Sequence, residues 1–172
     1  MENGFKKVVS SMVIQKTILA IAHKINRDYK NETPVFISVL NGSFLFTADL
    51  VKKVKGNCEV SFVKVSSYKG TQSKGVVNEL IGLNENITGR NIIILEDIVD
   101  SGKTLEKVYQ ELKKKKPRSI KVCALFVKPN TYSQKIKIDY MGINMPNDFL
   151  VGYGLDLNGR YRNLKDVYKV TQ

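Results

Sequence analysis

The sequence predicts an α/β fold built on a parallel sheet. Runs with the composition of strands alternate with runs of helical periodicity, which is typical of strand–helix–strand units. After Asn91, the run IIIL at residues 92–95 is uniformly apolar and mostly β-branched, as expected for a central strand covered on both faces. A chain of 172 residues with 42% hydrophobic residues is long enough for one hydrophobic core.

The first half of the chain predicts helices and strands in alternation. Apolar residues recur at helical spacing through residues 14–29. Pro34 then opens the strand VFISVL, which an NGS turn separates from the helix-like FLFTADLVKKV. The segment CEVSFVKVSS alternates as a second strand and leads into YKGTQSKG, whose composition is typical of a mobile loop. A further short strand is expected at residues 76–81.

The second half is predicted to complete the core and add a cap. EDIVDSGKTL follows the central strand and leads into a helix that Pro117 ends, and SIKVCALFV supplies the next strand. From about residue 128 the strand signal is weak. We therefore expect a single domain over residues 1–172, with its core at about 30–127 and a cap from about 128–172 together with the N-terminal segment.

The net charge of +12 predicts a polyanionic partner, which could be a nucleic acid, a nucleotide or a phosphorylated sugar. The densest basic run, Lys113–Lys116, is expected to end a helix, where lysines complement the macrodipole. No aromatic residues interleave it, so nucleic acid is disfavoured. The sequence has no apolar run of membrane-spanning or signal-peptide length, and we expect a cytoplasmic protein without a membrane partner.

Two acids and a glycine-containing turn indicate a site for a phosphorylated sugar. Glu96 and Asp97 directly follow the central strand, where burial without a cation or hydroxyl partner would be costly. The turn DSGKT at residues 100–104 opens a helix, whose free N–H groups attract a phosphate. The nucleoside triphosphate loop is excluded because Asp97 stands where that motif requires its first glycine.

The segment ILEDIVDSGKTL closely resembles the phosphoribosyl diphosphate motif of type I phosphoribosyltransferases. VLNGSFLFTADL, VSSY, LFVKP and DFLVGYGLDLNGRYRNL resemble segments of the hypoxanthine-guanine members, in the right order, across most of residues 35–165. The resemblance implies the type I phosphoribosyltransferase fold with a small hood, and a Mg²⁺-dependent purine salvage reaction. In that reaction, 5-phospho-α-D-ribose 1-diphosphate and a 6-oxopurine base give a nucleotide and pyrophosphate. A homodimer or homotetramer is also implied.

The resemblance further implies roles for individual residues. Asp100 would be the general base at the purine N7, Phe149 would stack on the base and Lys128 would donate to its 6-oxo group. Ribose and its 5′-phosphate would be bound by Glu96, Asp97, Asp100, Ser101, Gly102, Lys103 and Thr104. The purine site would comprise Lys128, Phe149, Leu150 and Asp156, and the pyrophosphate site Leu40, Asn41, Gly42, Ser67, Tyr68 and Arg162. Magnesium would be held by Asp156 with Glu96 and Asp97.

One departure from the family pattern and several alternatives remain open at this level. Many relatives have a basic residue at the position of Asn41, so the contact to pyrophosphate is expected to be weaker here. Relatives also have a non-proline cis peptide at the position of Leu40–Asn41, whose backbone role we expect to be retained. The alternatives are an RNA-binding regulator like the pyrimidine attenuation proteins, and an adenine or orotate transferase. The sequence does not rank hypoxanthine, guanine and xanthine.

Overall fold

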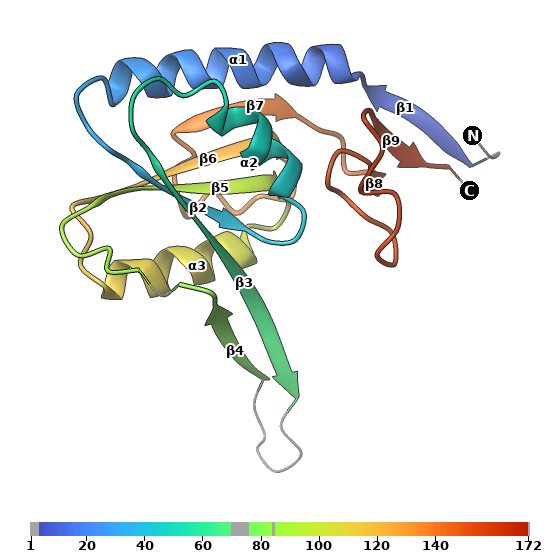
Figure 1. The fold of residues 1–172 in the computed structure, drawn as a ribbon. Coiled ribbons are helices and arrows are strands. Elements are labelled where there is room, and N and C mark those ends of the chain that lie inside the picture. Colours follow the sequence, from blue (N-terminus) through green and yellow to red (C-terminus); the bar gives the residue numbers. More distant parts are fainter. Residues whose placement is uncertain (1–3, 70–75, 84, 172) are drawn as a thin grey trace.

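The computed structural model describes residues 4–69, 76–83 and 85–171, with the backbone alone described at 66–69 and 76–81. In the described chain, a six-stranded sheet has the order β4-β3-β2-β5-β6-β7, and a three-stranded sheet has the order β1-β9-β8 (Figure 1). The helices are α1 (Ser11–Asp28), α2 (Phe44–Val51) and α3 (Lys103–Lys114). The strands are β1 (Phe5–Val9), β2 (Val35–Val39), β3 (Glu59–Lys69), β4 (Val76–Ile81), β5 (Asn91–Val99), β6 (Ser119–Val127), β7 (Tyr140–Asn144), β8 (Leu150–Val151) and β9 (Val167–Val170).

The large sheet is parallel from β3 to β7, and only β4 runs antiparallel to its neighbour. Figure 1 shows α1 and α2 on one face and α3 on the other. Successive residues of β5 pack on opposite faces: Ile93 and Leu95 join the cluster under α1 and α2, while Ile92 and Ile94 join the cluster under α3. This arrangement explains the uniformly apolar run and confirms the predicted α/β class.

The sequence did not predict two parts of the fold. β7 adds a fifth parallel strand at the edge of the large sheet, although its sequence YMGIN is only partly buried. β1 pairs with β9 from the other end of the chain, in the register Phe5↔Val170, and closes the small antiparallel sheet. Both strands depend on partners that a local pattern does not reveal.

The small sheet lies beyond the carboxyl ends of the parallel strands and is fixed to α1 (Figure 1). Asp166, just before β9, is buried and accepts a hydrogen bond from the backbone N–H of Ser11 at 2.7 Å. Its other oxygen lies 2.7 Å from Nζ of Lys7 on β1. Asp166 thus satisfies one free N–H at the start of α1 and joins both ends of the chain. None of the helices in the described part of the chain has the length and apolar content needed to cross a bilayer.

Candidate active site

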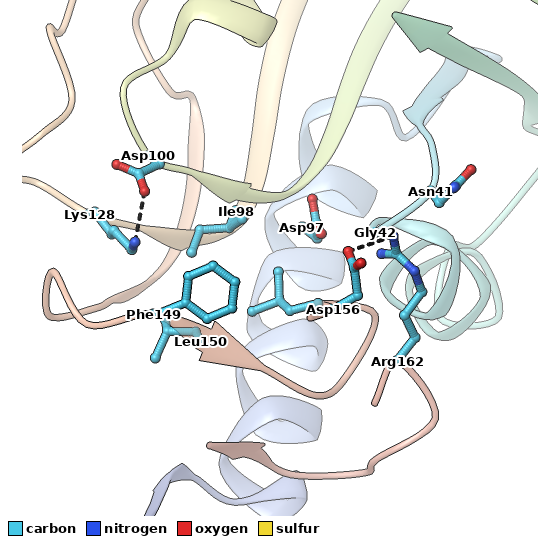
Figure 2. Close-up of a pocket in the computed structure, with 11 residues that line it drawn as sticks. Asn41, Gly42, Asp97, Ile98, Asp100, Lys128, Phe149, Leu150, Asp156 and Arg162 are labelled. Atoms are coloured by element: carbon cyan, nitrogen blue, oxygen red, sulfur yellow. Dashed lines mark hydrogen bonds and ion pairs between the residues drawn. The ribbon is translucent and has the colours of Figure 1, made fainter. Parts of the chain in front are cut away.

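The candidate site lies where three neighbouring parallel strands end. β2 pairs with β5, and β5 pairs with β6 as far as Val99↔Val127, so the residues that follow these strands meet at one edge. A pocket of about 360 Å³ opens there, and the small sheet forms its opposite wall (Figure 2). Nine of the residues implied by the resemblance line it, together with two that were not implied, Ile98 and Leu155. The nine are Asn41, Gly42, Asp97, Asp100, Lys128, Phe149, Leu150, Asp156 and Arg162.

Glu96 and Asp97 lie within β5, which continues to Val99 instead of ending before them as the sequence led us to expect, and they are buried on different sides of the strand. Asp97 lines the main pocket, whereas Glu96 lines a hollow of about 100 Å³ beside the turn at residues 100–104. Burial raises the pKa of Asp97 to about 6, an effect partly offset by the backbone N–H of Ile98. Burial raises the pKa of Glu96 well above its ordinary value, and its Oε1 has no hydrogen-bond partner among the described residues. Two buried acids with so few donors are suited to bind hydroxyl groups or a cation.

The turn before α3 has the geometry of a phosphate cradle. Gly102 caps the helix with a φ of +82°, and the hollow beside it is lined by Asp100, Ser101, Gly102, Lys103 and Thr104. A Cβ on Gly102 would lie 2.4 Å from the ring of Tyr132, so both the backbone conformation and the packing require glycine. The N–H groups at the start of α3 and the helix dipole favour a bound phosphate in this hollow.

Asp100 and Lys128 form an ion pair at the side of the main pocket. Nζ of Lys128 lies 2.7 Å from Oδ2 of Asp100, and the lysine side chain is 10% exposed while the aspartate is 51% exposed. Thr131 donates to the other carboxylate oxygen at 2.7 Å. The hydrogen bond from Lys128, followed by that from Thr131, lowers the pKa of Asp100 below its ordinary value. Asp100 is therefore an ionised acceptor beside a cationic donor at neutral pH.

The small sheet contributes an apolar wall opposite this pair. Phe149, which directly precedes β8, is 55% exposed although it is aromatic, and its ring lies in the pocket (Figure 2). Leu150 is buried behind it in β8. A half-exposed ring at a concave site offers a flat apolar face to a planar ligand.

Asp156 and Arg162 close the other end of the pocket. Their side chains are 2.6 Å apart, and Asp156 also accepts from the backbone N–H of Gly159 at 2.7 Å. Arg162 donates to the carbonyl of Gly154 at 2.6 Å. These contacts orient a guanidinium beside the pocket, where its remaining donors can bind an anionic group.

The loop after β2 brings its backbone close to the buried acids. The Leu40–Asn41 peptide bond is cis, as the resemblance led us to expect. A Cβ on Gly42 would lie 1.6 Å from Oδ2 of Asp97, so only glycine allows this approach. Ser43 anchors the end of the loop by donating to the carbonyl of Val39 at 2.5 Å. Asn41 lines the pocket with an uncharged amide.

Ser67 and Tyr68 are the two implied site residues whose side chains the structure does not describe. Their backbone belongs to β3 and pairs with Asn78 and Val77 of β4. The resemblance also implies that the loop carrying Ser67 and Tyr68 closes over the site; residues 70–75 lie outside the described chain, so the mobile loop and this closure remain predictions.

The carboxylates of the site suit a magnesium ion that is bound together with a substrate. No group of three or more His, Cys, Asp or Glu side chains able to hold a metal occurs in the described ranges. Mg²⁺ is, however, commonly held by one or two carboxylates together with substrate phosphates and water. Asp97 and Asp156 share the pocket, and the charge of Asp156 contributes to the raised pKa of Asp97. These two carboxylates fit a magnesium ion that arrives with a polyphosphate, whereas Glu96 faces the neighbouring hollow.

Comparison with known proteins agrees with this geometry. A family model described as a phosphoribosyl transferase domain matches residues 6–158. The hypoxanthine-guanine phosphoribosyltransferase of Streptococcus pyogenes serotype M3 is 41% identical over 95% of this chain and 92% of its own length. The hypoxanthine phosphoribosyltransferase of Buchnera aphidicola subsp. Schizaphis graminum is 38% identical over 99% of this chain and 98% of its own length.

Solved structures show the same likeness in three dimensions. The crystal structure of a hypoxanthine-guanine phosphoribosyltransferase from Bacillus anthracis superposes with a TM-score of 0.87 at 35% identity, covering 96% of this chain and 98% of that one. These identities extend over nearly the full length of the compared chains, so the likeness is one of sequence as well as of fold. The chain therefore belongs to the type I phosphoribosyltransferase family, in its hypoxanthine-guanine branch.

Proposed function

We propose that this chain is a purine salvage enzyme that transfers the 5-phosphoribosyl group of 5-phospho-α-D-ribose 1-diphosphate to N9 of a 6-oxopurine. The observation that carries this proposal is the pairing of Asp100 with Lys128, 2.7 Å apart, at the side of a pocket walled by Phe149. A 6-oxopurine protonated at N7 presents an acceptor, O6, directly beside a donor, N7–H. The lysine ammonium and the aspartate carboxylate match that edge in order and in spacing.

The same pairing argues against adenine as a substrate. Adenine carries an amino group at position 6, which can donate but cannot accept from the ammonium of Lys128. Lys128 is nearly buried, so an unmatched contact there would cost about 1 to 3 kcal/mol. Hypoxanthine and guanine are the proposed substrates, and xanthine shares the same edge.

The phosphoribosyl group would span the hollow beside α3 and the main pocket. Its 5′-phosphate would accept from the backbone N–H groups of the turn at residues 101–104, at the positive end of the helix dipole. Glu96 and Asp97 would accept hydrogen bonds from the ribose hydroxyls, which would supply the donor that Oε1 of Glu96 lacks. The two acids would also stabilise positive charge that develops on the sugar.

The leaving pyrophosphate would lie between Arg162 and the loop after β2. Arg162 offers donors, and the backbone around Asn41 and Gly42 approaches the same region. Asp97 and Asp156 would hold Mg²⁺ with the diphosphate, and the bound ion would supply positive charge that stabilises the departing oxygens.

The reaction forms one bond and breaks one bond at C1 of the ribose. N9 of the purine supplies the electron pair of the new bond, and the bond from C1 to the pyrophosphate oxygen breaks with its electrons on that oxygen. The proton at N7 passes to the carboxylate of Asp100, which Lys128 and Thr131 keep ionised. General base assistance of this kind typically contributes on the order of a hundredfold or more.

An activity assay of the purified protein tests the proposal. The protein is incubated with phosphoribosyl diphosphate, Mg²⁺ and one base at a time: hypoxanthine, guanine, xanthine or adenine. Nucleotide and pyrophosphate should form in equal amounts with 6-oxopurines and be barely detectable with adenine. Absence of nucleotide with every 6-oxopurine would refute the function. A gel shift with RNA at physiological salt would then test the alternative that the protein is an RNA-binding regulator.

We also propose that the protein is cytoplasmic and forms a homodimer or a homotetramer. Analytical ultracentrifugation would measure the oligomeric state.

A further inference from the structure

A single helical turn after β6 holds one side of the candidate site. The backbone N–H of Lys128 donates to the carbonyl of Val99 at 2.9 Å, which ties the turn to the end of β5. The N–H groups of Thr131 and Tyr132 donate back to the carbonyl of Lys128 at 3.2 and 3.0 Å. The turn therefore places the side chains of residues 128 and 131 on the same side, toward Asp100.

The carboxylate of Asp100 is held at both oxygens by this turn. Oγ1 of Thr131 lies 2.7 Å from Oδ1 of Asp100 and 3.3 Å from the carbonyl oxygen of Lys128. A hydroxyl has a single proton, and the shorter contact is to the charged acceptor, so the proton points to Asp100. Lys128 binds the other oxygen, Oδ2, at 2.7 Å.

We propose that Thr131 is a positioning residue for Asp100 in the transfer reaction, an inference that rests on the proposed function. When a 6-oxopurine binds, the ammonium of Lys128 donates to O6 of the base and its hydrogen bond to Oδ2 of Asp100 weakens. The hydroxyl of Thr131 keeps its hydrogen bond to Oδ1 during this exchange. The carboxylate therefore keeps the same side-chain conformation, and Oδ2 stays directed at N7–H. Without the hydroxyl, a side chain that is 51% exposed would rotate and be solvated by water.

The competing explanation is that Thr131 only stabilises the turn. Tyr132 already serves that purpose, because its ring packs where a Cβ on Gly102 would be and its hydroxyl donates to the carbonyl of Ile136. A loss of turn structure would disturb the neighbouring phosphate cradle and weaken phosphoribosyl diphosphate binding. A loss of carboxylate orientation would lower turnover and leave that binding intact.

Steady-state kinetics of Thr131→Val, Thr131→Ala and Thr131→Ser separate these explanations. We expect the valine and alanine variants to lower kcat for hypoxanthine about 3- to 10-fold, with the KM for phosphoribosyl diphosphate unchanged within about twofold. The serine variant, which keeps the hydroxyl, should retain most of the wild-type kcat. Thr88→Val is the matched control, since that hydroxyl donates to the carbonyl of Lys115.

A double-mutant cycle with Asp100→Asn provides the second readout. If Thr131 acts through Asp100, adding Thr131→Val to Asp100→Asn should lower kcat no further. Equal kcat in wild type and Thr131→Val, an impaired serine variant, or full additivity in the cycle would each overturn the inference. An inactive wild-type protein would instead refute the proposed function.

Discussion

Replacing Lys128 by methionine removes the donor assigned to the purine 6-oxo group. The side chain of Lys128 is 10% exposed, and methionine fills a similar volume, so the wall of the pocket should keep its shape. Asp100 loses one partner but is half-exposed, and water can solvate the freed oxygen. We therefore expect little change in the free energy of unfolding.

The expected kinetic loss follows from one hydrogen bond with a charged donor. Such bonds contribute about 1.5 to 3 kcal/mol, which corresponds to a fall of about 10- to 150-fold in kcat/KM for both hypoxanthine and guanine. Lys128 lowers the pKa of Asp100, so the variant raises that pKa toward its ordinary value of 3.8. Asp100 stays ionised at pH 7 in both proteins, and the loss at neutral pH therefore reports on base recognition and orientation.

Initial rates with varied base and varied phosphoribosyl diphosphate measure this loss. Binding of phosphoribosyl diphosphate should be nearly unchanged, because its proposed contacts lie in other parts of the site. Lys135→Met is a suitable control, since Lys135 forms an exposed ion pair with Glu106 at 3.1 Å. Full activity of Lys128→Met on both 6-oxopurines, or efficient use of adenine by the wild type, would refute the base-recognition argument.

Four further substitutions test other parts of the structure. Asp100→Asn should lower kcat about a hundredfold in steady-state assays while phosphoribosyl diphosphate affinity, measured by calorimetry, is retained, because the amide cannot accept the N7 proton. Asp156→Ala and Arg162→Ala should weaken pyrophosphate use in the reverse reaction by about tenfold or more, and a selective loss of base affinity would contradict this assignment. Asp166→Asn should lower Tm at neutral pH. Lys7 lowers the pKa of Asp166 below its ordinary value of 3.8, so the stabilisation is present above about pH 4 and the Tm difference should shrink as pH falls below it.

The core of the fold could be predicted from sequence because its signals are local. β5 and β6 are apolar over most of their length, and both are buried against helices on two faces. The turn at residues 100–104 was also predictable, since an acid pair followed by a glycine-containing helix start is a contiguous pattern. β4 was found at residues 76–81 as expected.

The cap was expected to combine the N-terminal segment with the end of the chain, but the strands of the small sheet and their pairing could not be predicted because their contacts join distant parts of the chain. β1 has the sequence FKKVV, and its lysines gave no apolar alternation to distinguish it from a loop. Its pairing with β9 and the contact from Asp166 to Ser11 span more than 150 residues. Such contacts form only when the whole chain is folded, so the sequence near each strand has little information about them.

The relation between Asp100 and Lys128 shows how strand register determines the chemistry of the site. The resemblance gave each residue a separate contact to the base, whereas the structure places them in one ion pair. β5 and β6 pair as far as Val99↔Val127, and Asp100 and Lys128 are the next residue on each strand. A shift of β6 by one residue would turn Lys128 to the other face of the sheet and would also remove Thr131 from Oδ1. The donor–acceptor pair that we propose to bind a 6-oxopurine therefore depends on the parallel hydrogen-bond ladder between two buried strands. Apolar substitutions that disturb β6 should impair base recognition without touching the pocket.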